Sequence, residues 1–165
     1  MQGGQIFYSW PNNEIIIPHL SPAFQIKIQS SEAANQYSQS HRIENAYDDN
    51  VNTIYAPPDN VGENWVKFNL RSLNRITRVV VINRIDCCFD LLNNTEVNVV
   101  DTAIQRTSLC GVIDVDEETG EDGTYTIDCK GLVGDRLMMT DRDVSARATL
   151  SFAEIDIYGI GRIGK

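Results

Sequence analysis

A long succession of short strand-like segments restricts the fold of this 165-residue chain more than any other feature. Residues 24–28 and 65–70 alternate apolar and polar side chains with a period of two, as strands with one buried face do. Residues 76–82 are rich in β-branched side chains, which is typical of a buried central strand. The candidate strands lie at residues 24–28, 65–70, 76–82, 96–100, 125–127, 136–139 and 149–158. Many short strands separated by turn-rich loops predict an all-β fold, either a β-sandwich or a jelly roll.

Residues 31–37 have a helix-like composition, and serines that could cap a short helix stand at the start of this stretch. All five prolines lie within the first 58 residues, and the first part of the chain is therefore expected to be extended and irregular. We place a lead-in or linker at residues 1–22, one domain at residues 23–159 and a C-terminal tail at residues 160–165.

The formal net charge of −9 bears on the partners of the chain. Binding to nucleic acid requires clusters of Lys and Arg that displace counterions from the phosphates, and the sequence contains no such cluster. Nucleic acid and anionic membrane surfaces are therefore poor partners. No apolar run approaches the ~18 residues that a membrane-spanning helix needs, so no membrane insertion is expected. An acidic surface suits divalent cations or neutral ligands, although a high charge also simply favours solubility.

Catalytic motifs find little support in the sequence, and we predict that the chain is not an enzyme. It has two histidines, His19 and His41, and no serine within the glycine pattern of a nucleophile elbow. Carboxylates are numerous, with 23 Asp and Glu, but no pattern singles out a catalytic pair. The four cysteines lack paired C-x-x-C spacing, which argues against a zinc site.

The adjacent residues Cys87 and Cys88 follow the most strand-like run of the chain. The ordinary alternatives bond them separately to Cys110 and Cys129, or leave all four cysteines reduced. A bond between the two neighbours would close a strained ring, because adjacent Cα atoms are about 3.8 Å apart and disulfides usually span about 4.4–6.8 Å. Strain of this kind is found mainly at functional sites, so residues 83–90 are the first candidate for one.

This segment resembles the signature of the F-type lectins, or fucolectins, in which Arg-x-Asp-Cys-Cys is followed shortly by a second arginine. Arg84, Asp86, Cys87 and Cys88 match that motif. The resemblance covers roughly residues 24–158. Three further segments resemble parts of the family: residues 45–50 its calcium loop, residues 63–70 its aromatic strand and residues 151–157 its final strand.

The resemblance implies a fold, two disulfides and a metal. The fold is an antiparallel jelly-roll β-sandwich of the discoidin and coagulation-factor C-domain type, and the disulfides are Cys87–Cys88 and Cys110–Cys129. The metal is one structural Ca²⁺, bound partly by backbone carbonyls of residues 55–60 and around Ala153. Its side-chain ligands are Asn45, Asp48, Asn50 and Glu154. Oxygen ligands of this kind suit calcium and not zinc, and the alternative is an Asx-rich turn without an ion.

The resemblance also implies a sugar site. In the family, the disulfide between adjacent cysteines packs on the apolar edge of the sugar, while two arginines and a histidine bind the sugar oxygens. This chain departs from that pattern, since Leu91 aligns with the second arginine and residues 55–60 hold no histidine. His41 is a candidate replacement, and an exposed surface histidine is the alternative. The residues implicated in sugar binding are Arg84, Asp86, Cys87, Cys88, Phe89, Leu91 and His41.

Two functions are consistent with these features. The first is a calcium-stabilised carbohydrate-recognition module, a lectin, whose altered or weakened site binds a glycan such as a fucosylated glycoconjugate. The second is a protein-interaction or cell-adhesion module that has kept the scaffold and lost sugar binding. Four paired cysteines imply an oxidising compartment, so either function is expected outside the cell, in a secreted or cell-surface ectodomain.

Overall fold

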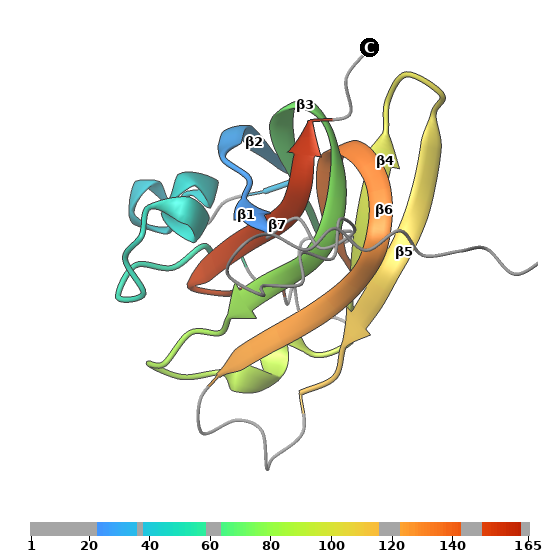
Figure 1. Cartoon of the computed structure of the whole chain (residues 1–165). Helices are drawn as coiled ribbons and strands as arrows, with labels where there is room; N and C mark the ends of the chain where they lie inside the picture. The colour runs from blue at the N-terminus through green and yellow to red at the C-terminus, as the bar shows by residue number, and fades with distance from the viewer. Residues whose placement is uncertain (1–22, 36–37, 59–63, 116–122, 143–149, 163–165) are drawn as a thin grey trace, which may run out of the picture.

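The structure is a computed structural model, and it describes residues 23–35, 38–58, 64–115, 123–142 and 150–162 (Figure 1). The strands are β1 (Phe24–Gln25), β2 (Ile28–Ala33), β3 (Trp65–Ile82), β4 (Thr95–Asp101), β5 (Arg106–Ile113), β6 (Thr124–Asp141) and β7 (Glu154–Arg162), and the short 3-10 helices are η1 (Gln39–His41), η2 (Ile43–Tyr47) and η3 (Phe89–Leu92). Within these ranges, every helix is too short or too polar to cross a membrane.

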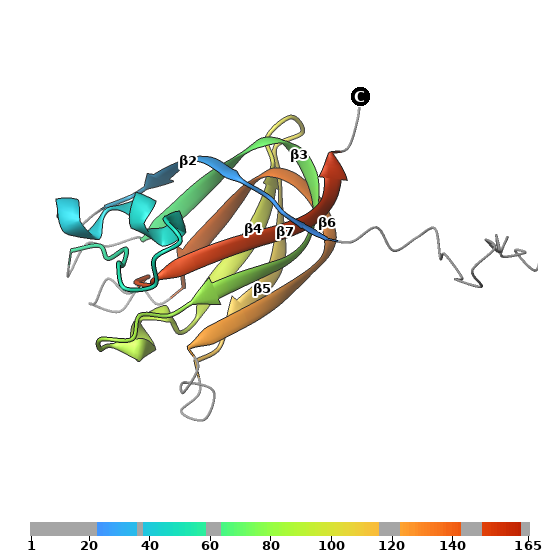
Figure 2. The same ribbon diagram turned by 60° about the vertical axis from the view of Figure 1, so that its left-hand side comes forward.

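The strands pair antiparallel in the order β1-β7-β3-β6-β4-β5, and β2 joins β3 beside this path. β3 and β6 have 18 residues each, and both take part in the two halves of the fold. β3 pairs with β2 up to Leu70 and with β7 from Asn74 onward, and its register with β6 shifts between Asn69 and Asn74. The sheet therefore curls around a common core, as Figures 1 and 2 show. This architecture confirms the predicted antiparallel jelly-roll β-sandwich.

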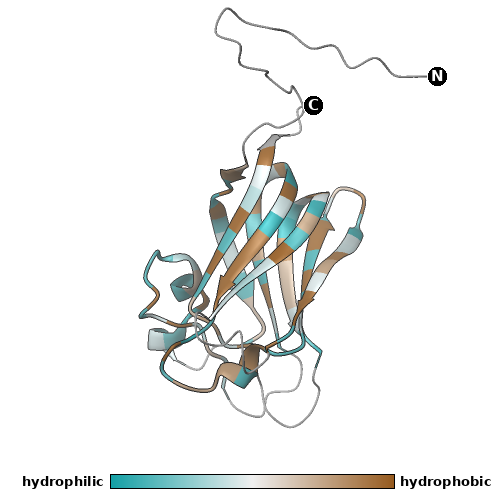
Figure 3. Ribbon diagram, turned by 60° about the horizontal axis from the view of Figure 1, so that its bottom comes forward, coloured by the Kyte–Doolittle hydropathy of each residue, from teal (hydrophilic) through white to brown (hydrophobic). Residues whose placement is uncertain are grey.

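Alternating side chains of the strands fill the space between the two halves. On β3, Val66, Phe68 and Leu70 are buried, and each is followed by a more exposed residue. Figure 3 shows this alternation as hydrophobic and hydrophilic bands along the ribbons. Tyr55 and Phe152, which lie outside the named strands, are also fully buried. Burying a large apolar side chain contributes about 1.5–3 kcal/mol, so this core is the main source of stability.

The helix predicted at residues 31–37 is wrong where the structure describes it. Ser31 and Ala33 belong to β2, in which they pair with Phe68 and Val66 of β3. A helix of seven residues gains little from intrinsic propensity, because nucleation is unfavourable and few hydrogen bonds follow it. Pairing with a long, buried strand is therefore the stronger influence on this segment. Residues 36–37 lie outside the described residues.

Strand lengths also differ from the sequence-based expectation. β5 was not predicted, because it is an edge strand with half of its residues exposed and a register shift against β4 between Val97 and Asn98. Both features break the alternation that marks a strand in a sequence. β7 continues to Arg162, three residues past the predicted domain end at 159. The predicted lead-in at residues 1–22 lies outside the described residues.

A disulfide joins two strands that are not neighbours in the hydrogen-bonded order. Cys110 of β5 bonds to Cys129 of β6, with their Cα atoms 4.4 Å apart, while β4 is the strand that pairs with both β5 and β6. The bond therefore links the edge strand β5 to the opposite half of the sandwich. It is the long-range pairing that the resemblance implied.

Candidate functional site

The loop after β3 lies at one end of the sandwich, beside the start of β7 (Figure 1). Its first residue, Asn83, is 1% exposed. The Asn83 side chain accepts a hydrogen bond from the backbone N–H of Arg84 at 2.9 Å and donates one to the carbonyl of Phe89 at 2.9 Å. Its backbone N–H donates to the carbonyl of Gly123 at 2.6 Å. A buried amide that uses its polar atoms in this way braces the loop across residues 84–89.

Cys87 and Cys88 are bonded to each other at the exposed tip of this loop. Cys88 adopts the left-handed backbone conformation, with a φ of 61°, and η3 begins at the next residue. Ile85 and Phe89 on either side are 66% and 44% exposed. The disulfide and its two apolar neighbours therefore expose apolar groups at the tip of the loop.

The Arg84 side chain is held on two sides next to this surface. Its Nε and Nη2 donate to the two carboxylate oxygens of Asp86 at 2.7 and 2.6 Å, and its Nη1 donates to the hydroxyl of Ser151 at 3.1 Å. The Asp86 hydrogen bond raises the pKa of Arg84, and Arg84 lowers the pKa of Asp86 to about 2. A guanidinium has five N–H groups, so among the described residues one on Nη1 and one on Nη2 are left without a partner. Arg84 can therefore donate to two further acceptor oxygens.

Ser151 and Tyr55 connect Arg84 to the segment before β3. The Ser151 hydroxyl donates to the carbonyl of Tyr55 at 3.1 Å. Tyr55 and Phe152 exchange backbone hydrogen bonds of 2.9 and 3.2 Å. The Tyr55 hydroxyl donates to the carbonyl of Asn35 at 2.7 Å, and burial raises the pKa of that hydroxyl above its usual range. These bonds anchor the segment to the start of β7.

Of the residues implicated in sugar binding, all except His41 lie in the loop after β3. Leu91 is half-buried within η3, where its backbone N–H donates to the carbonyl of Cys88 at 3.1 Å. His41 ends η1, and its Nδ1 lies 2.9 Å from the Ser38 hydroxyl. The His41 carbonyl accepts from the backbone N–H of Ala56 at 3.3 Å. His41 therefore contacts the segment around Tyr55, and this segment is connected to Arg84 through the hydrogen bonds of Ser151.

The residues proposed as calcium ligands form a turn with many internal hydrogen bonds. The Asn45 amide is 7% exposed and donates to the carbonyls of Ser40 and Ile54 at 2.8 and 3.0 Å. Asp48 accepts from the Thr53 hydroxyl and from the backbone N–H of Asn50. The Asn45 amide oxygen and further lone pairs of Asp48 remain for a cation.

Glu154 brings a second carboxylate to this turn. It is the first residue of β7 and is 5% exposed, and its Oε2 has no hydrogen-bond partner among the described residues. Burial, and after it the negative charge of Asp48, raises the pKa of Glu154 to about 7, while the backbone N–H groups of Asp49 and Asn50 oppose this shift. A cation bound close to Glu154 would offset both the burial of this carboxylate and the negative charge of Asp48.

The donor set at this turn bears on the kind of metal that could bind. Within the described ranges, no three His, Cys, Asp or Glu side chains are arranged to hold a metal ion. A cation here would thus depend on amide and backbone oxygens in addition to the two carboxylates. Such a mixture of oxygen ligands is typical of calcium sites.

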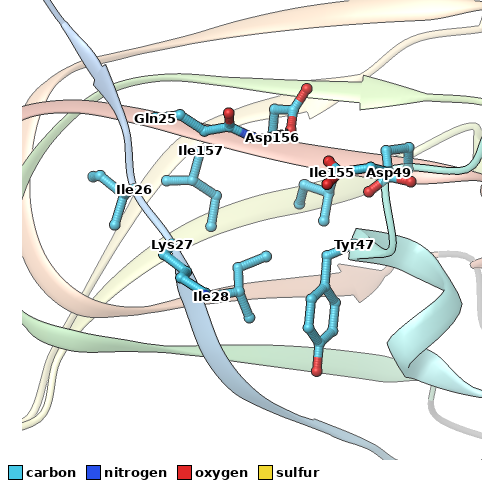
Figure 4. A pocket seen from close by; sticks show the side chains of 10 residues that line it. Gln25, Ile26, Lys27, Ile28, Tyr47, Asp49, Ile155, Asp156 and Ile157 are labelled. Atoms are coloured by element: carbon cyan, nitrogen blue, oxygen red, sulfur yellow. Dashed lines mark hydrogen bonds between the residues drawn. The ribbon is translucent and has the colours of Figure 1, made fainter.

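A hollow of about 430 Å³ lies beside Glu154, between the β1–β2 segment and β7 (Figure 4). Four isoleucines line it, together with Gln25, Lys27, Tyr47, Asp49, Glu154 and Asp156. Gln25 donates to Asp156 at 2.7 Å. Burial, followed by the charge of Asp49, raises the pKa of Asp156. Three carboxylates and one lysine therefore line the hollow, which includes the first residues of β7.

The sequence did not identify the residues outside the loop after β3 that hold Arg84 through hydrogen bonds. Ser151 and Tyr55 lie in segments that the resemblance covers, but the hydrogen bond between them spans 96 residues and the bond from Arg84 to Ser151 spans 67. Neither residue type nor local spacing carries a signal for such contacts. The role of Asn83 was missed for a different reason, since an asparagine at the end of a strand is an ordinary turn residue.

The comparisons with known proteins agree on the fold. The family model described as NedA-like, galactose-binding domain matches residues 45–139, more than half of the chain. No curated protein sequence matches the chain.

Three similar solved structures come from two bacteria and a fish. A fucose-binding module of Streptococcus pneumoniae is 20% identical with a TM-score of 0.62, over 80% of this chain and 94% of that one. The family 32 carbohydrate-binding module of Clostridium perfringens NanJ, solved with galactose, is 15% identical with a TM-score of 0.64, over 82% and 99%. A fucolectin from striped bass serum is 19% identical with a TM-score of 0.66, over 80% and 46%. At these identities the likeness establishes the fold alone.

Proposed function

Because the chain belongs to the family of NedA-like, galactose-binding domains, we propose that it is a carbohydrate-binding module whose site is the loop after β3. The observation that carries this proposal is the Arg84 guanidinium beside the exposed Cys87–Cys88 disulfide. Asp86 and Ser151 hold this guanidinium, and within the described part of the chain two of its N–H groups are left over. We further propose that the module acts without catalysis and outside the cell, since two disulfides suit an oxidising compartment.

The chemistry of a sugar complements this arrangement. A sugar ring offers hydroxyl oxygens on its edges and an apolar C–H face. The two remaining N–H groups of Arg84 would donate to two sugar oxygens, and Asp86, which is 57% exposed, would accept from a hydroxyl. The disulfide and Phe89 would pack on the C–H face, where burial of apolar area is favourable. Because Asp86 offsets the charge of Arg84, a neutral sugar suits the site better than an acidic one.

The fucose site of F-type lectins would be altered in this chain. Leu91 stands where that family has its second arginine, so one set of charged donors is replaced by a half-buried apolar side chain. A hydrogen bond to a charged group contributes about 1.5–3 kcal/mol. We therefore expect weak or absent binding of free L-fucose, with the ligand making further contacts to Phe89 or to the segment that carries His41.

Arg84→Ala is expected to weaken glycan binding by about 100-fold or more, because two charged hydrogen bonds to the sugar are lost. The melting temperature should stay nearly unchanged, because an ion pair with an exposed partner contributes only about 0–1 kcal/mol. A screen of galactose- and fucose-terminated glycans, followed by titration calorimetry on the best ligand, measures this. The matched control is Arg142→Ala, which removes a 3.0 Å ion pair with Glu96. A variant that binds as the wild type does, or a wild type that binds no glycan, would contradict the sugar site.

A second candidate function is that of a protein-interaction or adhesion module. The exposure of Ile85 and Phe89 favours this function, because apolar side chains at 66% and 44% exposure could also contact a partner protein. The same screen separates the two functions. Binding to no glycan at all would favour the protein partner and leave the scaffold unchanged.

We also propose one structural Ca²⁺, with Asn45, Asp48, Asn50 and Glu154 as its side-chain ligands and with backbone carbonyls of residues 55–60 and around Ala153. One observation supports the fit: the Glu154 Oε2 is buried without a partner in the described part of the chain. A bound cation would also offset the burial and the negative charge of Asp48 that raise the pKa of Glu154. The ion would supply positive charge between the two carboxylates. It would join the start of β7 to the turn after η2.

Removing calcium is expected to lower the melting temperature by about 5–10 °C. A ligand present at 100 times its Kd stabilises the folded state by about 2.7 kcal/mol, and 1 kcal/mol corresponds to about 2–4 °C for a domain of this size. Melting curves with excess calcium and with EDTA measure the shift. Glu154→Gln should abolish the shift, and Asp156→Asn, which alters a carboxylate outside the ligand set, should preserve it. An unchanged midpoint, together with no metal in elemental analysis, would refute the calcium proposal.

A further inference from the structure

Ser151 is a polar residue inside an otherwise tightly packed segment. The six residues from 150 to 155 are all buried, and Ser151 is 1% exposed. A hydroxyl at such a position must be hydrogen-bonded to avoid a desolvation cost. Its one hydrogen goes to the carbonyl of Tyr55, and its oxygen accepts from Nη1 of Arg84. Both partners are far away in sequence, so the serine joins two separate segments.

The contact with Arg84 differs in kind from the contact with Asp86. Asp86 lies two residues from Arg84, on the same loop, and is 57% exposed, so it can follow the guanidinium wherever the loop moves. Ser151 precedes β7 and is fixed by the buried backbone around Phe152. Among the described residues, it is the hydrogen-bond partner of Arg84 that lies outside the loop after β3.

We infer that Ser151 is a positioning residue, which orients the Arg84 guanidinium toward the ligand and fixes it relative to the segment that carries Tyr55 and His41. With three N–H groups committed to Asp86 and Ser151, the other two are held in one orientation. They therefore favour a ligand whose acceptor oxygens match this fixed orientation. This selectivity rests on the proposed carbohydrate-binding function, while the orientation of Arg84 is a property of the free protein.

Ser151→Ala removes the hydroxyl without adding volume, so the variant is expected to fold. The Tyr55 carbonyl keeps its hydrogen bond from the backbone N–H of Phe152, and Nη1 of Arg84 is the group that loses a partner. In the free protein, nitrogen-15 NMR of the arginine side chains should show separate Nη1 and Nη2 signals for Arg84 in the wild type. In Ser151→Ala, the Nη1 protons should exchange with water at least tenfold faster, while the Nε–H signal, held by Asp86, persists.

The binding experiment uses the best glycan from the screen. Ser151→Ala should bind it about tenfold more weakly, and the control Ser108→Ala, at a half-buried serine of β5, should bind it as the wild type does. In an Arg84→Lys background, Ser151→Ala should cause no further loss, because lysine has no second nitrogen to position. Unchanged Arg84 signals in Ser151→Ala, with or without a loss of affinity, would overturn the inference. A wild type that binds no glycan but shows the NMR change would refute the proposed function and keep the positioning role.

Discussion

Phe152→Ala is expected to lower the free energy of unfolding by about 4 kcal/mol, since truncating a buried phenylalanine typically costs about 3–5 kcal/mol. Phe152 is fully buried, and its ring packs edge-on against Tyr55, with the ring centroids 5.9 Å apart at an interplanar angle of 64°. Its backbone also pairs with that of Tyr55. The substitution would leave a cavity at the point where the segment before β3 meets the start of β7.

Urea denaturation at a fixed calcium concentration measures this loss. The matched control is Phe89→Ala, because Phe89 is 44% exposed and its truncation should change stability by no more than about 0.5 kcal/mol. The two variants should separate stability from binding. Phe89→Ala should weaken glycan binding with little change in unfolding, whereas a loss below about 1.5 kcal/mol in Phe152→Ala would show that this contact does not anchor the two segments.

Some strands of the fold could be predicted from the sequence, and others could not. The alternation in residues 65–70 and the β-branched side chains of residues 76–82 predicted two separate strands, and the structure joins both in the single 18-residue strand β3. Residues 31–33 were misjudged because their partner in β3 lies more than 30 residues away. A local sequence pattern does not indicate with which strand such a segment will pair.

The candidate site likewise contains residues that the sequence identified and residues that it did not. The loop after β3 was identified because Arg84, Asp86 and the adjacent cysteines are contiguous, and the structure gives their ion pair and disulfide directly. Ser151, which hydrogen-bonds to Arg84 from outside the loop, could not be identified. Its contacts depend on how the start of β7 packs against the segment at Tyr55. For the metal ligands, the resemblance suggested Asp48 and Glu154 together, and their role in binding calcium stays a prediction.

Replacing both Cys110 and Cys129 with alanine is expected to lower the free energy of unfolding by about 3 kcal/mol. The disulfide spans 19 residues, and a crosslink over a loop of that size removes about 3 kcal/mol of chain entropy from the unfolded state. β5 is also the edge strand and hydrogen-bonds along its length with β4, so the disulfide is its covalent link to the opposite half of the sandwich. We expect β5 to show the largest loss of amide-exchange protection in the variant.

Replacing Cys87 and Cys88 with alanine is the matched control for this experiment. That disulfide joins neighbouring residues and closes no loop in the unfolded chain, so the entropic contribution should be nearly absent. Both cysteines are exposed, so little packing is lost either. Urea unfolding under non-reducing conditions should therefore show a large loss for one double variant and a small one for the other, whereas glycan affinity should show the reverse. Equal losses of stability would mean that the bond between β5 and β6 does not act through the unfolded state.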